Sequence, residues 1–135
     1  MNSMTWNNSM SVNVESLDAQ HKAIIALISE LGDAMNAGKT DVVIGSILSK
    51  LIAYTQYHFD YEENCMIVSC FAHHDHHKCE HDGLKKKVKA LEKDFLAGKA
   101  NVADEIMNTL QQWLDHHIMK TDMLYSSHFT TIGLQ

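Results

Sequence analysis

Apolar residues recur at alternating spacings of three and four along four segments of this 135-residue chain, with polar residues between them. That spacing puts the apolar side chains on one face of an α-helix, and such a face is buried when helices pack together. The pattern predicts helices at residues 18–38, 41–65, 75–97 and 102–127. We therefore expect an all-α fold in which four helices share one core.

Two similar short sequences separate the first helix from the second and the third from the fourth. They are NAGKTD at 36–41 and LAGKAN at 96–101. Each has a glycine where a helix should end and, two or three residues later, a side chain that can cap the next helix. These residues are Gly38 and Thr40 in the first sequence, and Gly98 and Asn101 in the second. With a third break at 66–74, the turns predict an up-down-up-down four-helix bundle.

The composition supports a helical fold. The chain has no proline and is 45% hydrophobic, mostly Leu, Ile, Ala and Met, which favour helix over strand. Its length fits a single domain over residues 1–135. Asp18 is a candidate N-cap of the first helix, which would leave residues 1–17 as an extended N-terminal arm.

Charge and cysteine content restrict the partners and the compartment. The formal charge of −6 and a single short basic run at 85–87 argue against nucleic acid and acidic membranes as partners. The sequence has neither a transmembrane-length apolar run nor a signal-peptide pattern, so we expect no membrane insertion and a cytoplasmic location. Cys65, Cys70 and Cys79 lack the spacing of a disulfide framework and are expected to be free thiols.

Every predicted helix carries a histidine on its buried face. The histidines and the acid on these faces are His21, His58, Glu62, His77, His81 and His117, and Thr55 lies on the same face of the second helix. The buried face of the fourth helix continues to Leu124. In a bundle of alternating helix direction, the starts of the first and third helices lie beside the ends of the second and fourth. The histidines and Glu62 are therefore expected to meet in space.

Glu62 favours a metal ion at this meeting point. A single buried histidine is more often a hydrogen-bonded core residue than a ligand. An unpaired buried carboxylate, however, is strongly unfavourable, and no lysine or arginine shares the buried faces near Glu62. A metal ion would compensate the carboxylate and would bind the neutral imidazoles.

The histidine-rich sequence HHDHHKCEH at 73–81 contributes two of these residues, His77 and His81, one helical turn apart. The other three histidines lie off the buried face. A separate zinc site is a weaker alternative, because the usual close cysteine pairs are missing. Its ligands would be Cys70, His73, His74 and Cys79.

The ordered pattern of a lone histidine, His-x3-Glu, His-x3-His and His-x4-Asp resembles the bacterial hemerythrins. The similar stretches are SVNVESLDAQHK, HFDYEE, HKCEH and WLDHHIMKTDMLY, so the resemblance covers nearly the whole chain. The loop MIVSCFAHHD departs from the family, because relatives commonly have a glycine–aromatic–proline turn there. No proposed ligand lies in that turn.

The resemblance implies two iron ions with a bridging oxo or hydroxo group, and dioxygen binding at a vacant position on the second iron. The implied ligands are His77, His81 and His117 on one iron, His21 and His58 on the other, and Glu62 and Asp122 as bridges. Only the resemblance nominates Asp122. Five residues on a regular helix turn through about 140°, so His117 and Asp122 share a face only if the helix widens locally or Asp122 reaches around its flank.

The resemblance implies reversible dioxygen binding for carriage, storage or delivery, without catalysis. Apolar residues expected around the dioxygen are Trp113, Leu114, Ile118 and Phe59. A possible partner is an oxygen-accepting enzyme.

The alternatives are a di-iron peroxidase, oxidase or nitric-oxide-handling enzyme, an oxygen or iron sensor, and a metal store. An enzyme needs a proton donor near the iron, and the buried faces show no evident one. The nearby hydroxyl groups that could serve are those of Tyr54, Tyr57, Tyr61 and Thr55. A sensor is less expected, since the bundle uses the whole sequence.

Overall fold

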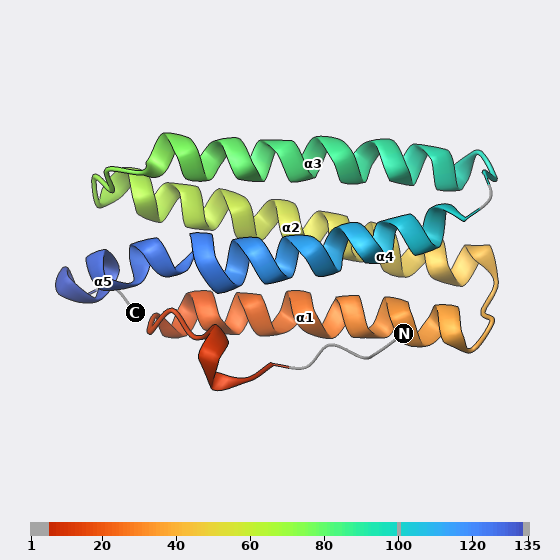
Figure 1. Cartoon of the computed structure of the whole chain (residues 1–135), viewed down its shortest axis with the longest axis horizontal. Coiled ribbons are helices and arrows are strands. Elements are labelled where there is room, and N and C mark those ends of the chain that lie inside the picture. The colour runs from red at the N-terminus through yellow and green to blue at the C-terminus, as the bar shows by residue number, and fades with distance from the viewer. Residues whose placement is uncertain (1–5, 100, 134–135) are drawn as a thin grey trace.

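The computed structural model describes residues 6–99 and 101–133, and the elements within them are all helical (Figure 1). In chain order they are η1 (Asn8–Met10), α1 (Glu15–Asn36), α2 (Asp41–Val68), α3 (His74–Leu96), α4 (Val102–Trp113), η2 (Leu114–Thr121) and α5 (Met123–Thr131). Figure 1 shows α1 and α3 running in one direction and α2 and α4 in the other, with η2 and α5 continuing the line of α4. The predicted all-α class is confirmed.

Helices α1 and α3 end close to Gly38 and Gly98, as the two glycines predicted. Gly38 and Gly98 have φ values of 65° and 79°, which only glycine adopts without strain. Thr40 caps α2 as predicted, since its hydroxyl accepts a hydrogen bond from the amide of Val43 at 3.4 Å. Asn101 precedes α4 in a left-handed conformation but makes no side-chain cap, so that part of the prediction is wrong.

Helix α1 begins at Glu15, three residues before the predicted N-cap. Asp18 is instead inside the first turn, where its carboxylate accepts hydrogen bonds from the Ser11 hydroxyl at 2.6 Å and the Val12 amide at 2.9 Å. These bonds tie the preceding segment to the helix, and Val12 and Val14 are fully buried. The predicted arm therefore ends too late, and its first five residues lie outside the described part of the chain.

Two buried apolar clusters lie on either side of the polar residues in the interior of the bundle. The larger cluster fills the middle of the bundle and includes Ile24, Phe59, Leu84 and Trp113. The smaller cluster lies at the end and consists of Val12, Val14, Leu17, Met66, Phe71, Tyr125 and Phe129. Along α1, His21 stands between Leu17 of the smaller cluster and Ile24 of the larger one. The polar residues of the bundle interior are therefore closed off from water on both sides.

The segment η2 is a π-helix, in which each backbone hydrogen bond joins residues five apart instead of the four of an α-helix. The extra residue changes which side chains face the core. Leu124, predicted to be buried, is 56% exposed, and Tyr125 is fully buried in its place. The prediction for Leu124 was wrong because it extended a regular helical period through η2.

No helix within residues 6–99 and 101–133 has the length and apolarity needed to cross a membrane.

Candidate metal centre

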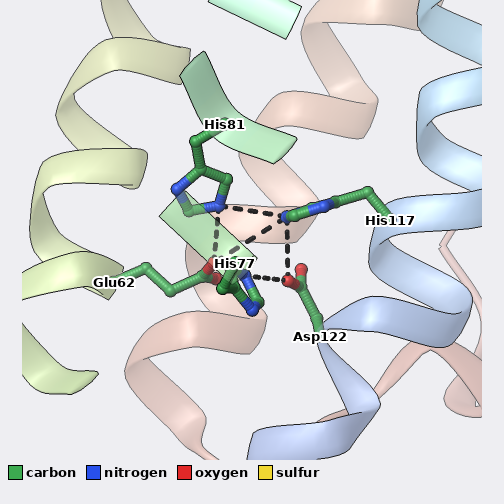
Figure 2. Close-up of side chains that lie close together, drawn as sticks. All are labelled: Glu62, His77, His81, His117 and Asp122. Carbon is green, nitrogen blue, oxygen red and sulfur yellow. Dashed lines mark hydrogen bonds and ion pairs between the residues drawn. The ribbon is translucent and has the colours of Figure 1, made fainter. Parts of the chain in front are cut away.

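The seven metal-ligand candidates lie together in the interior of the bundle. They form two groups whose ligand atoms lie within 4.8 Å of one another: Glu62, His77, His81, His117 and Asp122 in one, and His21, His58, Glu62 and Asp122 in the other. Figure 2 shows the first group, with side chains from α2, α3, η2 and the turn before α5 pointing at a common point. The three-histidine half and the two-histidine half share both carboxylates.

Each shared carboxylate presents one oxygen to each half. Glu62 Oε1 lies 2.6 Å from His77 Nε2 and 2.9 Å from His81 Nε2. Its other oxygen, Oε2, lies 3.1 Å from Nε2 of His58 and 3.5 Å from Nε2 of His21. This is the arrangement of a carboxylate that could bridge two cations.

Asp122 repeats the arrangement from the opposite side. Its Oδ1 lies 2.8 Å from His77 Nε2 and 3.0 Å from His117 Nε2, and its Oδ2 lies 3.1 Å from His21 Nε2. Neither oxygen has a hydrogen bond of acceptable geometry, although both are buried. Buried carboxylate oxygens without hydrogen bonds are costly, and a cation among these nitrogens and oxygens would compensate them.

The imidazoles also turn their lone pairs inward. Nδ1 of His81 donates to Glu63 Oε2 at 2.9 Å, and Nδ1 of His117 donates to Glu80 Oε1 at 3.1 Å. With the proton on Nδ1, a neutral ring has a bare Nε2, and the two Nε2 atoms lie only 3.0 Å apart. Two facing lone pairs at this distance require a proton or a metal ion between them. The donor set therefore fits a cation centre.

Charge in the site is balanced by protons when no metal is bound. Burial alone would lower the pKa of His21 and of His77, but the carboxylates of Asp122 and Glu62 raise both to about 9. Burial alone would raise the pKa of Glu62, and the histidines, His58 foremost, hold it well below its usual range. The pocket is thus built to hold positive charge beside two carboxylates.

Asp122 reaches the centre because η2 is wider than an α-helix. The sequence pattern of the family nominated this residue, and regular helical geometry did not. The amide of Asp122 donates to the carbonyl of His117, five residues earlier, at 2.7 Å. The fifth residue therefore occupies the place that the fourth would take in an α-helix, which is the local widening that the spacing required.

Tyr125 is a residue of the centre that the sequence analysis missed. Its hydroxyl donates to Glu62 Oε2 at 2.7 Å, and its ring stacks on His77 with centroids 5.4 Å apart. Thr55, one of the hydroxyl candidates, instead donates to the carbonyl of Leu51 at 2.7 Å. Only the shift of period in η2 could have revealed Tyr125, because a regular helix puts Leu124 in its position.

The four predicted pocket residues are buried around the histidines. Phe59 stacks on His81 with ring centroids 3.9 Å apart, and Trp113 stacks on His117 at 5.1 Å. Leu114 and Ile118 are also fully buried in the larger apolar cluster. The wall of the site on this side is therefore apolar, while the dioxygen-contacting role of these residues stays a prediction.

The remaining histidines and the cysteines do not form a second centre. Among the described residues, the two groups above are the only clusters of three or more metal-donor side chains, so the zinc alternative at Cys70 and Cys79 has no structural support. All three cysteines are free. His76 instead contacts Glu80, with 3.0 Å between Nε2 and Oε2.

Comparison with known proteins gives one consistent result. The model of the Hemerythrin HHE cation binding domain matches residues 12–128. A bacteriohemerythrin of Methylococcus capsulatus is 37% identical over 90% of this chain and 93% of its own length, and one of Pseudomonas aeruginosa is 31% identical over 90% and 78%. A crystal structure of wild-type hemerythrin superposes with a TM-score of 0.86 and 36% identity, over 93% of this chain and 97% of that one.

Proposed function

The chain belongs to the hemerythrin family, and on this premise we propose that it binds dioxygen reversibly at a non-haem di-iron centre. The observation that carries the proposal is the paired bridging geometry of Glu62 and Asp122, each with one oxygen toward each group of histidines. A metal store without dioxygen chemistry has no need for two shared carboxylates at one buried point. Carriage, storage or delivery of dioxygen is the role that we assign to the protein.

The ligands follow the two groups of side chains. We assign one iron to His77, His81 and His117 and the other to His21 and His58, with Glu62 and Asp122 shared between them. The two-histidine half thus offers one protein donor fewer and would leave room for a small ligand beside its iron. When bound, two ferrous ions supply the two electrons that reversible dioxygen binding uses.

The apolar wall keeps water and protons from this side of the centre. Phe59 and Trp113 cover the imidazoles of His81 and His117, and Leu114 and Ile118 are buried in the same apolar cluster. Exclusion of water prevents the side reactions that would oxidise the irons without returning dioxygen. This wall therefore keeps water from the three-histidine half of the shared centre.

Tyr125 supports binding over turnover. Burial, together with the charges of Asp122 and Glu62, raises the pKa of the Tyr125 hydroxyl well above its usual range. A general acid works best when its pKa lies near the operating pH, and in the metal-free fold the pKa of this hydroxyl lies above that range. It instead keeps its proton and holds Glu62 in place.

The test is an optical titration of the iron-loaded, anaerobically reduced protein with dioxygen, followed by removal of the gas. We expect a visible charge-transfer band that forms with dioxygen and disappears on degassing, over repeated cycles. Loss of the band with consumption of an added reductant or peroxide would favour an enzyme. Binding of iron without any dioxygen-dependent band would favour a store.

A cytoplasmic oxygen-consuming enzyme is the partner that we expect to receive the released gas.

A further inference from the structure

The polar groups behind the histidines differ between the two halves of the centre. In the three-histidine half, two imidazoles donate through Nδ1 to carboxylates. His81 donates to Glu63 at 2.9 Å, and His117 donates to Glu80 at 3.1 Å. These two carboxylates face the outer side of the rings, away from the shared carboxylates.

Within residues 6–99 and 101–133, the hydrogen bonds place no such charge behind the two-histidine half. Nδ1 of His58 donates to the amide oxygen of Gln20 at 2.8 Å, and Gln20 is itself buried. Nδ1 of His21 is buried and has no hydrogen-bond partner. One imidazole is therefore oriented by a neutral group, and the other is held only by packing and by its contacts inside the centre.

Both outer carboxylates are held in place from their other sides. The Thr121 hydroxyl donates to the two oxygens of Glu80 at 3.0 and 3.1 Å, and the exposed His76 and His116 lie against the same carboxylate. Glu63 has Lys78 Nζ at 3.8 Å and is only 9% exposed. The carboxylates are thus positioned by the fold.

A carboxylate that accepts a hydrogen bond from Nδ1 of a histidine fixes the tautomer and the orientation of the imidazole. It also makes Nε2 a stronger electron-pair donor to a metal. An amide fixes the ring but adds no charge. Since the same histidines bind the cation through Nε2, negative charge behind them strengthens the attraction to a cation in a buried site where solvent screening is weak.

We propose that Glu63 and Glu80 are positioning residues that make the three-histidine half bind its divalent cation more tightly than the two-histidine half, which stands in front of the neutral Gln20. The inference rests on the proposed two-metal function. It implies a fixed order, in which the three-histidine half fills first and the two-histidine half empties first.

The test is a titration of the metal-free full chain with Co²⁺, whose visible bands report the number of ions bound and their coordination. We compare the wild type with Glu63→Gln and Glu80→Gln, which keep an oxygen acceptor and lose only the charge. Loss of an outer partner typically weakens metal affinity about 10- to 100-fold, so we expect that loss in the tighter of two binding steps. The weaker step should stay unchanged. Glu92→Gln, eleven residues beyond His81 on α3, is the matched control, since Glu92 contacts Ser49 and no ligand.

The reverse substitution, Gln20→Glu, keeps the proposal testable if a glutamine variant fails to fold. It places a charge behind His58, and we expect tighter binding in the weaker step and slower release of that ion to a chelator. Equal effects on both steps, or no effect from any variant, would overturn the proposed order while leaving two ions bound. A wild type that takes up fewer than two Co²⁺ ions would instead overturn the proposed function itself.

Discussion

The amide of Asp122 lies 2.7 Å from the carbonyl oxygen of His117 and closes a π-helical turn. This single bond joins two proposed metal ligands through the backbone, so the position of one fixes that of the other. The carboxylate of Asp122 then lies beside His117, His77 and His21 with no hydrogen bond of its own. A cation bound among these groups would compensate the buried carboxylate.

Replacement of Asp122 by Asn should reduce the metal content of the protein. The substitution keeps the size of the side chain and removes the charge that both halves share, so we expect the loss of at least one of two bound ions. Metal analysis after dialysis measures the stoichiometry. Asp115→Asn, an exposed acid on the same segment η2, should retain two ions. Full metal content in the Asp122 variant would contradict a bridging role.

Metal uptake should release protons near neutral pH. His21 and His77 have pKa values of about 9 in the metal-free fold, so both rings are protonated at pH 7 and must lose a proton to bind metal. Affinity should therefore rise with pH and level off above about 9. An indicator dye in weak buffer measures the protons released on addition of Zn²⁺. His73→Ala, which changes an exposed histidine outside both groups, should release as many as the wild type.

The stability of the metal-free protein should fall as the pH rises from 6.5 to 9. The folded state raises the pKa of His21 and His77 from 6.5 to about 9, so their stabilisation is complete below 6.5 and is lost through 9. The lowered pKa values of Glu62 and Asp122 give stabilisation that is lost in acid, and the lowered pKa of His58 acts in the same direction below 6.5.

Urea unfolding at several pH values checks this dependence. We expect the largest free energy of unfolding of the metal-free chain in mildly acidic solution, and a smaller decline toward pH 9 once metal is bound. A metal-free protein that becomes steadily more stable up to pH 9 would show that these histidines carry no charge in the fold.

Tyr125→Phe should destabilise the metal-free protein by about 1–3 kcal/mol, because Glu62 Oε2 loses a buried hydrogen-bond donor. The ring and its stacking on His77 are kept. Chemical denaturation measures the change in free energy of unfolding. Tyr57→Phe, which removes a hydroxyl from a ring that is 54% exposed, should change the stability little. Equal effects from the two variants would mean that the bond to Glu62 contributes nothing.

Most of the bundle and of the centre could be predicted because regular helices carry a regular period. The buried faces placed His21, His58, Glu62, His77, His81 and His117 in the interior, and all six are buried there. The glycines at 38 and 98 fixed two helix ends, since each has the positive φ that ends a helix. Alternating helix direction then brought residues from distant parts of the chain to one end.

The parts that the sequence analysis missed depend on departures from that period. A π-helical turn has no local residue signature, so neither the exposure of Leu124 nor the burial of Tyr125 follows from spacing. Gln20, Glu63 and Glu80 were missed for another reason. They approach the outer nitrogens of the histidines from beside the buried faces, and a periodic pattern selects only residues on those faces.

The widened turn also makes the chain unequally tolerant of changes in length. Residues inserted at the Gly38 turn, at the far end of the bundle, would lengthen a loop and leave the interior as it is. One residue added within 118–121 would instead swing everything after it by about 100° around the axis. Asp122 and Tyr125 would leave the interior together, so a single-codon insertion there would remove a shared carboxylate and the hydroxyl that supports the other.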